Sequence, residues 1–231
     1  MLSHVPLTKD TIAYVATCTR AQRDDTMWHA LHDRVLTASR FGDALRAADD
    51  VTVRPNFLKR YFTKQNESVA MQYGVANESR ARIAYAHKTN YDVRETGIWL
   101  TPSGMLGASP DGIVYPNAQS ETPIGCLEIK CPYTLRNKTS ESFSEYMTHT
   151  FALGRYYDQI QGQLVATNLP WCDLVIWTEA AIDIKRIDAS EQWRTLCVPK
   201  LERFFATCIR PHMARMQHIL SDRICMLENR I

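Results

Sequence analysis

The chain has little that would place it in a membrane or make it a zinc protein. No apolar run in its 231 residues approaches the roughly 20 residues that cross a bilayer. Its seven cysteines include no CxxC pair and no Cys/His cluster of the zinc-binding kind. With an odd number of cysteines and no signal peptide, we expect no membrane partner and an intracellular, reducing setting: the cytoplasm of a bacterial host or the nucleus of a eukaryotic one.

An excess of charge of one sign is also missing. The chain carries 27 Lys and Arg against 25 Asp and Glu, a formal net charge of +2, and has no basic tail. Any affinity for nucleic acid must therefore come from local patches. Without repeats or low-complexity tracts, the length and composition predict one domain over 1–231, helical over about 1–88, with a sheet and flanking helices over about 89–231.

Hydrophobic spacing predicts the order of the elements. We expect helices over 8–20, 39–48 with Ser39 as N-cap, 55–64, 68–87, 154–167, and from 190 to the C-terminus with breaks near Pro199 and Pro211. We expect strands over 91–100, 105–109, 112–115, 124–130, 173–178 and 181–186, the second and third forming a hairpin interrupted at Pro110. This order predicts an α/β (α+β) fold with a central mixed β-sheet flanked by helices.

Two segments of this sheet carry the candidate chemistry. Asp111 precedes one apolar run, and Glu128 and Lys130 flank Ile129 inside a second. Because side chains alternate along a strand, Glu128 and Lys130 share one face and Ile129 points into the core. Two acids and a lysine on one side of a sheet can hold a divalent metal and activate a water, which is the chemistry of phosphodiester hydrolysis.

Each segment also has an ordinary interpretation. Pro-Asp-Gly around Asp111 is a good turn sequence, and Glu128 with Lys130 could be an ion pair on a solvent-facing strand. Apolar neighbours on both strands favour burial, however, and an unpaired buried carboxylate is costly. A metal or the lysine must then neutralise the cluster.

Two predicted helices and one loop supply further candidates. Glu78 lies on a helix rich in small residues that could pack close to the sheet, although a lone helical glutamate is usually a surface residue. Gln159 and Gln163 are four apart and share a helical face. The segment 28–40 combines basic residues and hydroxyls before a predicted helix, where free N–H groups could bind phosphate, or where the helix is simply capped.

Five motifs in order resemble the YqaJ-like viral recombinase (lambda exonuclease) family of PD-(D/E)XK nucleases. They are Trp28 with Leu36-Thr37-Ala38-Ser39, Gly74 with Glu78, Ser109-Pro110-Asp111-Gly112, Leu127-Glu128-Ile129-Lys130-Cys131-Pro132, and Gln159-Ile160-Gln161. The resemblance implies a restriction-endonuclease-like core. It also implies that Asp111, Glu128 and the carbonyl of Ile129 bind Mg²⁺ or Mn²⁺ and that Lys130 acts on the attacking water.

The same resemblance implies supporting roles for Glu78 and Gln159 and places Ser39 near the 5′ phosphate of the DNA. The family normally has an arginine four residues after the tryptophan, where this chain has His32. Arg34 lies two residues further on and could replace it. We therefore expect weak discrimination between phosphorylated and unphosphorylated 5′ ends.

The function implied is a metal-dependent exonuclease that digests double-stranded DNA ends 5′→3′ and leaves 3′ overhangs for recombination. A single-strand annealing protein and a homo-trimer are the partners that the family suggests. The alternatives are an alkaline-type nuclease with endonuclease or RNase activity on the same site, a non-catalytic DNA-end-binding module, and a structural α/β domain whose charged residues form only an ion pair.

Overall fold

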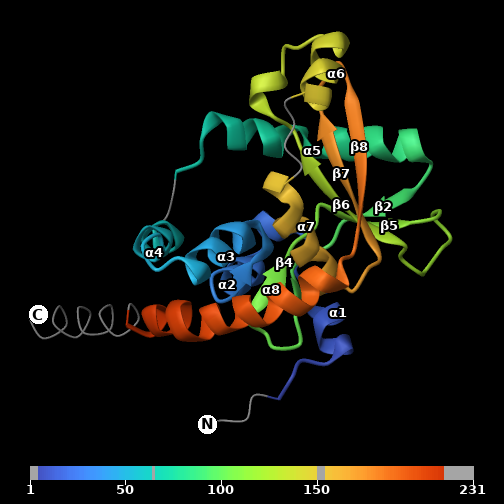
Figure 1. The fold of residues 1–231 in the computed structure, drawn as a ribbon. Helices are drawn as coiled ribbons and strands as arrows, with labels where there is room; N and C mark the ends of the chain where they lie inside the picture. Colours follow the sequence, from blue (N-terminus) through green and yellow to red (C-terminus); the bar gives the residue numbers. More distant parts are fainter. Residues whose placement is uncertain (1–4, 64–65, 150–153, 216–231) are drawn as a thin grey trace, which may run out of the picture.

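The computed structural model describes residues 5–63, 66–149 and 154–215 as helices packed around two β-sheets (Figure 1). The helices are α1 (Lys9–Cys18), α2 (Thr26–His32), α3 (Phe41–Asp49), α4 (Arg54–Phe62), α5 (Val69–Thr89), α6 (Ser140–His149), α7 (Gly154–Thr167) and α8 (Glu191–Phe204). The strands are β1 (Leu36–Thr37), β2 (Asp92–Arg94), β3 (Trp99–Leu100), β4 (Leu106–Ala108), β5 (Gly112–Tyr115), β6 (Gly125–Lys130), β7 (Trp171–Trp177) and β8 (Ile182–Asp188). Across these ranges, no helix has the length and apolar character to span a bilayer.

The larger sheet has the strand order β2-β5-β6-β7-β8. Strands β6 and β7 are parallel, with Glu128 opposite Leu174, and every other neighbouring pair is antiparallel. Parallel neighbours need a crossover connection, and here the chain between β6 and β7 contains α6 and α7. The crossover places α7 next to β6.

Alternation along β6 assigns its side chains to two different cores. Leu127 and Ile129 pack with Ala81 and Tyr85 of α5. Cys126, on the opposite face, packs in a cluster with residues of α6 and α7. Glu128 and Lys130 share the face of Cys126 because the period of a strand is two, so both point toward α7. This confirms the predicted orientation of these two residues and of Ile129.

A second, helical layer packs below the sheet in Figure 1. Helices α3, α4 and α8 bury Phe41, Ala44, Phe57 and Phe204 in a common cluster. The small sheet β1-β4-β3 joins this layer, with β1 parallel to β4 and β3 antiparallel to it. The fold is therefore α/β with mixed sheets flanked by helices, which confirms the predicted fold class.

Two predictions about strands were wrong. The segment 91–100 forms two short strands in different sheets, β2 and β3, instead of one. Segments 105–109 and 112–115 do not form a hairpin, because β4 pairs with β1 and β3 while β5 pairs with β2 and β6. Pro110 has no N–H to donate to a ladder, and the chain changes sheets there.

Predictions about helix ends also needed correction. Ser39 is not an N-cap, because it lies in a 3₁₀ turn (Ala38–Arg40) and α3 begins after Arg40. Helix α8 continues through Pro199, because Trp193, Leu201 and Phe204 anchor it in the core on both sides. A π-helical turn (Phe205–Ile209) precedes Pro211, and the helix continues to residue 215. The predicted extension over 216–231 lies outside the described residues, and α6 and α2 were not predicted.

The contact between α7 and the helical layer depends on Gly162. A Cβ at this position would lie 2.5 Å from Phe41 Cε2 and 2.9 Å from Ala38 Cβ, whereas a Cβ at Gly74 of α5 would meet nothing within 4 Å. Both glycines are inside helices, so replacing either one with alanine gives the same gain in helix propensity. We expect Gly162→Ala to lower the free energy of unfolding by about 1–3 kcal/mol and Gly74→Ala to raise it, as measured by urea denaturation. Equal effects of the two substitutions would contradict this packing.

Candidate active site

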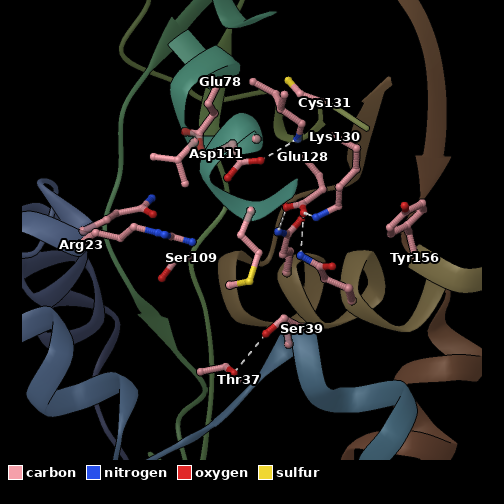
Figure 2. Close-up of a pocket in the computed structure, with 18 of the residues that line it drawn as sticks. Arg23, Thr37, Ser39, Glu78, Ser109, Asp111, Glu128, Lys130, Cys131 and Tyr156 are labelled. Carbon is pink, nitrogen blue, oxygen red and sulfur yellow. Dashed lines mark hydrogen bonds and ion pairs between the residues drawn. The ribbon is translucent and has the colours of Figure 1, made fainter. Parts of the chain in front are cut away.

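One cavity of about 430 Å³ brings most of the predicted site residues together (Figure 2). Its walls come from α2, the turn before α3, α5, β6 and α7, and from the segment that leads into β5. Of the residues predicted from the sequence, it is lined by His32, Ser39, Glu78, Asp111, Glu128, Ile129, Lys130 and Gln159. Arg34 is exposed and is not among the lining residues.

Asp111 is not a turn residue, because hydrogen bonds to the backbone of β6 hold it in place. Its backbone N–H donates to the carbonyl of Leu127 at 2.9 Å, which extends the β5–β6 ladder by one residue. Its Oδ2 accepts a hydrogen bond from the N–H of Ile129 at 2.6 Å. The other oxygen, Oδ1, has no hydrogen-bond partner in the described part of the chain. The backbone of β6 therefore fixes the carboxylate and leaves one oxygen available to a ligand.

Glu128 is a buried carboxylate, with 2% of its surface exposed. Its Oε1 pairs with Lys130 Nζ and accepts from Gln159 Nε2 at 2.6 Å, and its Oε2 accepts from Gln163 Nε2. A carboxylate has about four acceptor positions, and these three donors leave one of them on Oε2. Charge-assisted bonds of this kind offset the cost of burying the charge.

The charges in the cavity are strongly coupled. Burial, followed by the charges of Glu128 and Glu78, raises the pKa of Asp111 well above its ordinary value. Burial would lower the pKa of Lys130, but the charges of Glu128 and Asp111 outweigh burial and raise it, so the ammonium group stays protonated. The cluster has three carboxylates and one ammonium group facing it, and a further cation would be favourable there.

The donor set fits a hard divalent cation. Among the described residues, no group of three or more His, Cys, Asp or Glu side chains is arranged to hold a metal. The candidate ligands are the carboxylate of Asp111, whose Oδ1 is free, that of Glu128, which has one free acceptor position on Oε2, and the Ile129 carbonyl predicted from the family. Oxygen ligands in this number suit Mg²⁺, which usually keeps several of its waters.

Glu78 lies beside Asp111 on α5 (Figure 2). Its Oε1 accepts from Arg82 at 2.9 Å, and its side chain is 35% exposed. The Arg82 guanidinium therefore holds Glu78 at the rim, where its charge acts on Asp111.

Two of the predicted DNA-end residues, His32 and Ser39, line the same cavity, and Ser39 lies across it from Glu78 and Asp111 in Figure 2. The His32 ring stacks on Trp28 with 4.5 Å between centroids, and Trp28 Nε1 donates to Ser109 Oγ at 2.9 Å. Burial lowers the pKa of His32, so its imidazole is neutral at neutral pH. Ser39 is exposed, with its Oγ 3.3 Å from Thr37 Oγ1. His32 therefore brings no charge to the position where the family has arginine.

The cavity is also lined by Gln163, which shares a helical face with Gln159, and by Tyr156 and Arg23, for which the sequence predicted no role. Gln163 binds Glu128, and its spacing of four from Gln159 was the signal. Tyr156, three residues before Gln159, places its ring 5.4 Å from Lys130 Nζ. Arg23 lines the cavity and pairs with Glu67 at 2.8 Å. No sequence signal marked Arg23.

Gln22 supports the site from outside the sheet. Its Nε2 donates to the carbonyls of Thr96 and Pro110 at 2.9 and 3.1 Å. Its φ of 45° is a left-handed conformation that costs free energy in a residue other than glycine. Because Pro110 precedes Asp111, this contact helps to hold the aspartate segment against β6.

A family comparison agrees with the motifs in the chain. The model of the YqaJ-like viral recombinase domain matches residues 27–170, which is more than half of the sequence. The chain belongs to the YqaJ-like viral recombinase family. This confirms the predicted family, and family membership indicates divalent-metal dependence in general terms. No curated protein matches the chain.

Solved structures agree with the assignment to the YqaJ-like family. An alkaline exonuclease (LHK-Exo) from Laribacter hongkongensis is 25% identical, with a TM-score of 0.63, and the match covers 88% of this chain and 100% of that one. The structure of LHK-Exo in complex with dAMP is also 25% identical, with a TM-score of 0.61 and coverage of 87% and 97%. A phage-related exonuclease from Haemophilus somnus 129PT, 10% identical with a TM-score of 0.53 and coverage of 77% and 96%, shares the fold.

We expect Asp111→Asn to stabilise the metal-free protein. A carboxyl group whose pKa is higher in the folded protein than in the unfolded chain destabilises the fold at high pH. The loss of stability begins as the pH passes the pKa in the unfolded chain, about 4, and is complete above the pKa in the folded protein. Asparagine keeps an oxygen for the Ile129 N–H and removes the charge. In EDTA, Asp111→Asn should add about 0.5–2 kcal/mol at pH 8 and less at pH 5, as measured by thermal denaturation.

The matched control is Glu145→Gln, which makes the same change from carboxylate to amide on the exposed surface of α6. It should leave the melting temperature unchanged at both pH values. A lower stability of Asp111→Asn at pH 8 would contradict the charge balance described above.

Proposed function

We propose that this chain is a divalent-metal-dependent exonuclease that digests double-stranded DNA from its ends, 5′→3′, with Mg²⁺ or Mn²⁺ as the metal. The digestion leaves 3′ single-stranded overhangs that serve recombination or replication. The expected setting is intracellular, with a single-strand annealing protein and a homo-trimer as proposed partners.

The observation that carries the proposal is the meeting of Asp111, Glu128 and Lys130 in one cavity. Asp111 directly precedes β5 and Glu128 lies on the neighbouring strand β6, and the ammonium group contacts Glu128. A module that only binds DNA ends has no need of buried acids facing a phosphate backbone, because carboxylates repel it. The same arrangement suits the hydrolysis of a phosphodiester with the help of a bound metal ion.

The relatives support an enzyme. LHK-Exo is an alkaline exonuclease, and its complex with dAMP shows that protein with a nucleotide bound. Together with membership of the YqaJ-like family, this confirms the prediction of a hydrolase of the DNA exonuclease type. Polarity, product and the choice of metal are parts of the proposal.

Each residue then has a role that follows from its contacts. Asp111, Glu128 and the carbonyl of Ile129 would hold the divalent ion, which supplies Lewis-acid stabilisation and an acidified water. Lys130 stays protonated and stabilises negative charge on the phosphate in the transition state. Gln159, with Gln163, fixes the orientation of Glu128, and Glu78 supports the cluster from α5.

We expect Asp111→Ala and Lys130→Ala to lower the rate of duplex digestion by about 10³-fold or more while the far-ultraviolet circular dichroism stays native. Mg²⁺ or Mn²⁺ should raise the melting temperature of the wild type but not that of Asp111→Ala, and EDTA should abolish digestion. Glu145→Ala, on the exposed face of α6, serves as the control for activity. Full activity of Asp111→Ala in Mg²⁺ would refute the site.

The end preference is tested with end-labelled linear duplexes that carry 5′-phosphate or 5′-hydroxyl termini. Because His32 brings no charge, we expect the two rates to differ by less than about tenfold. A duplex labelled at its 5′ end should release the label first, and circular single-stranded DNA should stay intact. Early release of a 3′ label would reverse the polarity. A strong preference for phosphate that persists in Arg34→Ala would exclude Arg34 as the substitute for the family arginine.

A further inference from the structure

Three arginines surround a second, smaller cavity on the helical layer. Arg40 precedes α3, Arg46 lies on α3 and Arg60 on α4, and together with Asp43 and Asn56 they line a cavity of about 200 Å³. We call Arg40, Arg46 and Arg60 the arginine cluster. With one carboxylate among three guanidinium groups, the formal charge of this small region equals that of the whole chain, +2.

The arginine cluster has few partners of its own. Arg46 and Arg60 lie 3.7 and 3.8 Å from the two oxygens of Asp43, beyond the range of a good hydrogen bond. Their side chains are 72% and 62% exposed. No hydrogen bond joins any of the three guanidinium groups to the described part of the chain. The N–H donors are therefore free to bind an anion, while Asp43 of α3 lies near both Arg46 of α3 and Arg60 of α4 and keeps these two arginines facing the same space.

The arginine cluster adjoins the catalytic cavity. Thr37, Ala38 and Ser39 line the catalytic cavity, and Arg40 is the next residue in the same 3₁₀ turn. The charge of Arg40 also reaches His32 on the wall of the catalytic cavity. A polyanion that enters or leaves the catalytic cavity past Ser39 would meet Arg40 first and then Arg46 and Arg60.

We propose that the arginine cluster is a phosphate-binding subsite for the backbone of the DNA outside the catalytic cavity. This rests on the proposed function, since the ligand is the DNA that the exonuclease digests. Guanidinium groups present forked donors that match phosphate oxygens, and backbone phosphates occur in every sequence, as a general exonuclease requires. The subsite would also explain how a chain of low net charge binds DNA, because it concentrates positive charge where the DNA would pass.

The experiment measures the binding of a fluorescein-labelled blunt DNA duplex in EDTA by fluorescence anisotropy over a range of salt concentrations. The test variant is Arg46→Gln/Arg60→Gln. Its matched control is Lys9→Gln/Lys88→Gln, which removes two charges from exposed positions in α1 and at the end of α5, away from α3 and α4 (Figure 1). A third variant, Arg46→Lys/Arg60→Lys, keeps the charges and removes the forked donors.

The proposal predicts a loss of affinity on the order of tenfold at about 0.1 M salt for the double glutamine variant. The slope of log affinity against log salt should become shallower by about 2, one unit for each phosphate contact. The lysine variant should keep most of the slope, and the control pair should keep both the affinity and the slope. Circular dichroism checks that the variants are folded, which their exposed positions predict.

Affinity and slope equal to those of the control pair would overturn the proposal, and so would a double glutamine variant that binds DNA like the wild type but changes its oligomeric state. Because binding is measured without metal, the result does not depend on catalysis. A wild type that binds DNA through the arginine cluster but does not digest it would refute the exonuclease function alone.

Discussion

The arrangement of the site depends on one buried carboxylate, that of Glu128 on β6. Glu128 is 2% exposed, and an ionised carboxylate in such a place is tolerated only with hydrogen bonds and an opposite charge. Lys130 supplies the charge from the same face of β6, while Gln159 and Gln163 supply donors from α7. The parallel pairing of β6 with β7 requires the crossover that contains α7, so the topology of the sheet and the satisfaction of Glu128 are parts of one arrangement.

The backbone of β6 serves the site twice. Its alternation directs Glu128 and Lys130 toward α7, and its N–H at Ile129 holds Asp111 from the neighbouring segment. Gln22 and the change of sheet at Pro110 fix that segment from the other side. The carboxylates are thereby held together although their charges repel, and burial together with this repulsion raises the pKa of Asp111. A cation bound between the two carboxylates would relieve this repulsion, so metal binding would offset the stability that the metal-free protein loses.

The sequence predicted those features that depend on local pattern. Alternation in β6 gave the faces of Glu128, Lys130 and Ile129, and helical spacing gave α7 and the shared face of Gln159 and Gln163. Features set by long-range pairing were mispredicted, since nothing in the segment 91–100 shows that β2 and β3 join different sheets, and nothing local separates β4 from β5 except Pro110. Ser39 looked like an N-cap because its type is favoured there, but it lies inside the 3₁₀ turn Ala38–Arg40, and α3 begins after Arg40. Arg23 could not be predicted, because a lone charged residue has no pattern.

The central claim is that Asp111 and Glu128 bind a divalent cation together. The most direct test is an anomalous difference map from a crystal of the wild-type protein soaked in Mn²⁺, with a crystal of Asp111→Asn treated in the same way. Our account predicts a peak within ligand distance, about 2.0–2.3 Å, of a carboxylate oxygen of each residue, and its loss in the variant. A manganese peak elsewhere, or none between the two carboxylates, would contradict it.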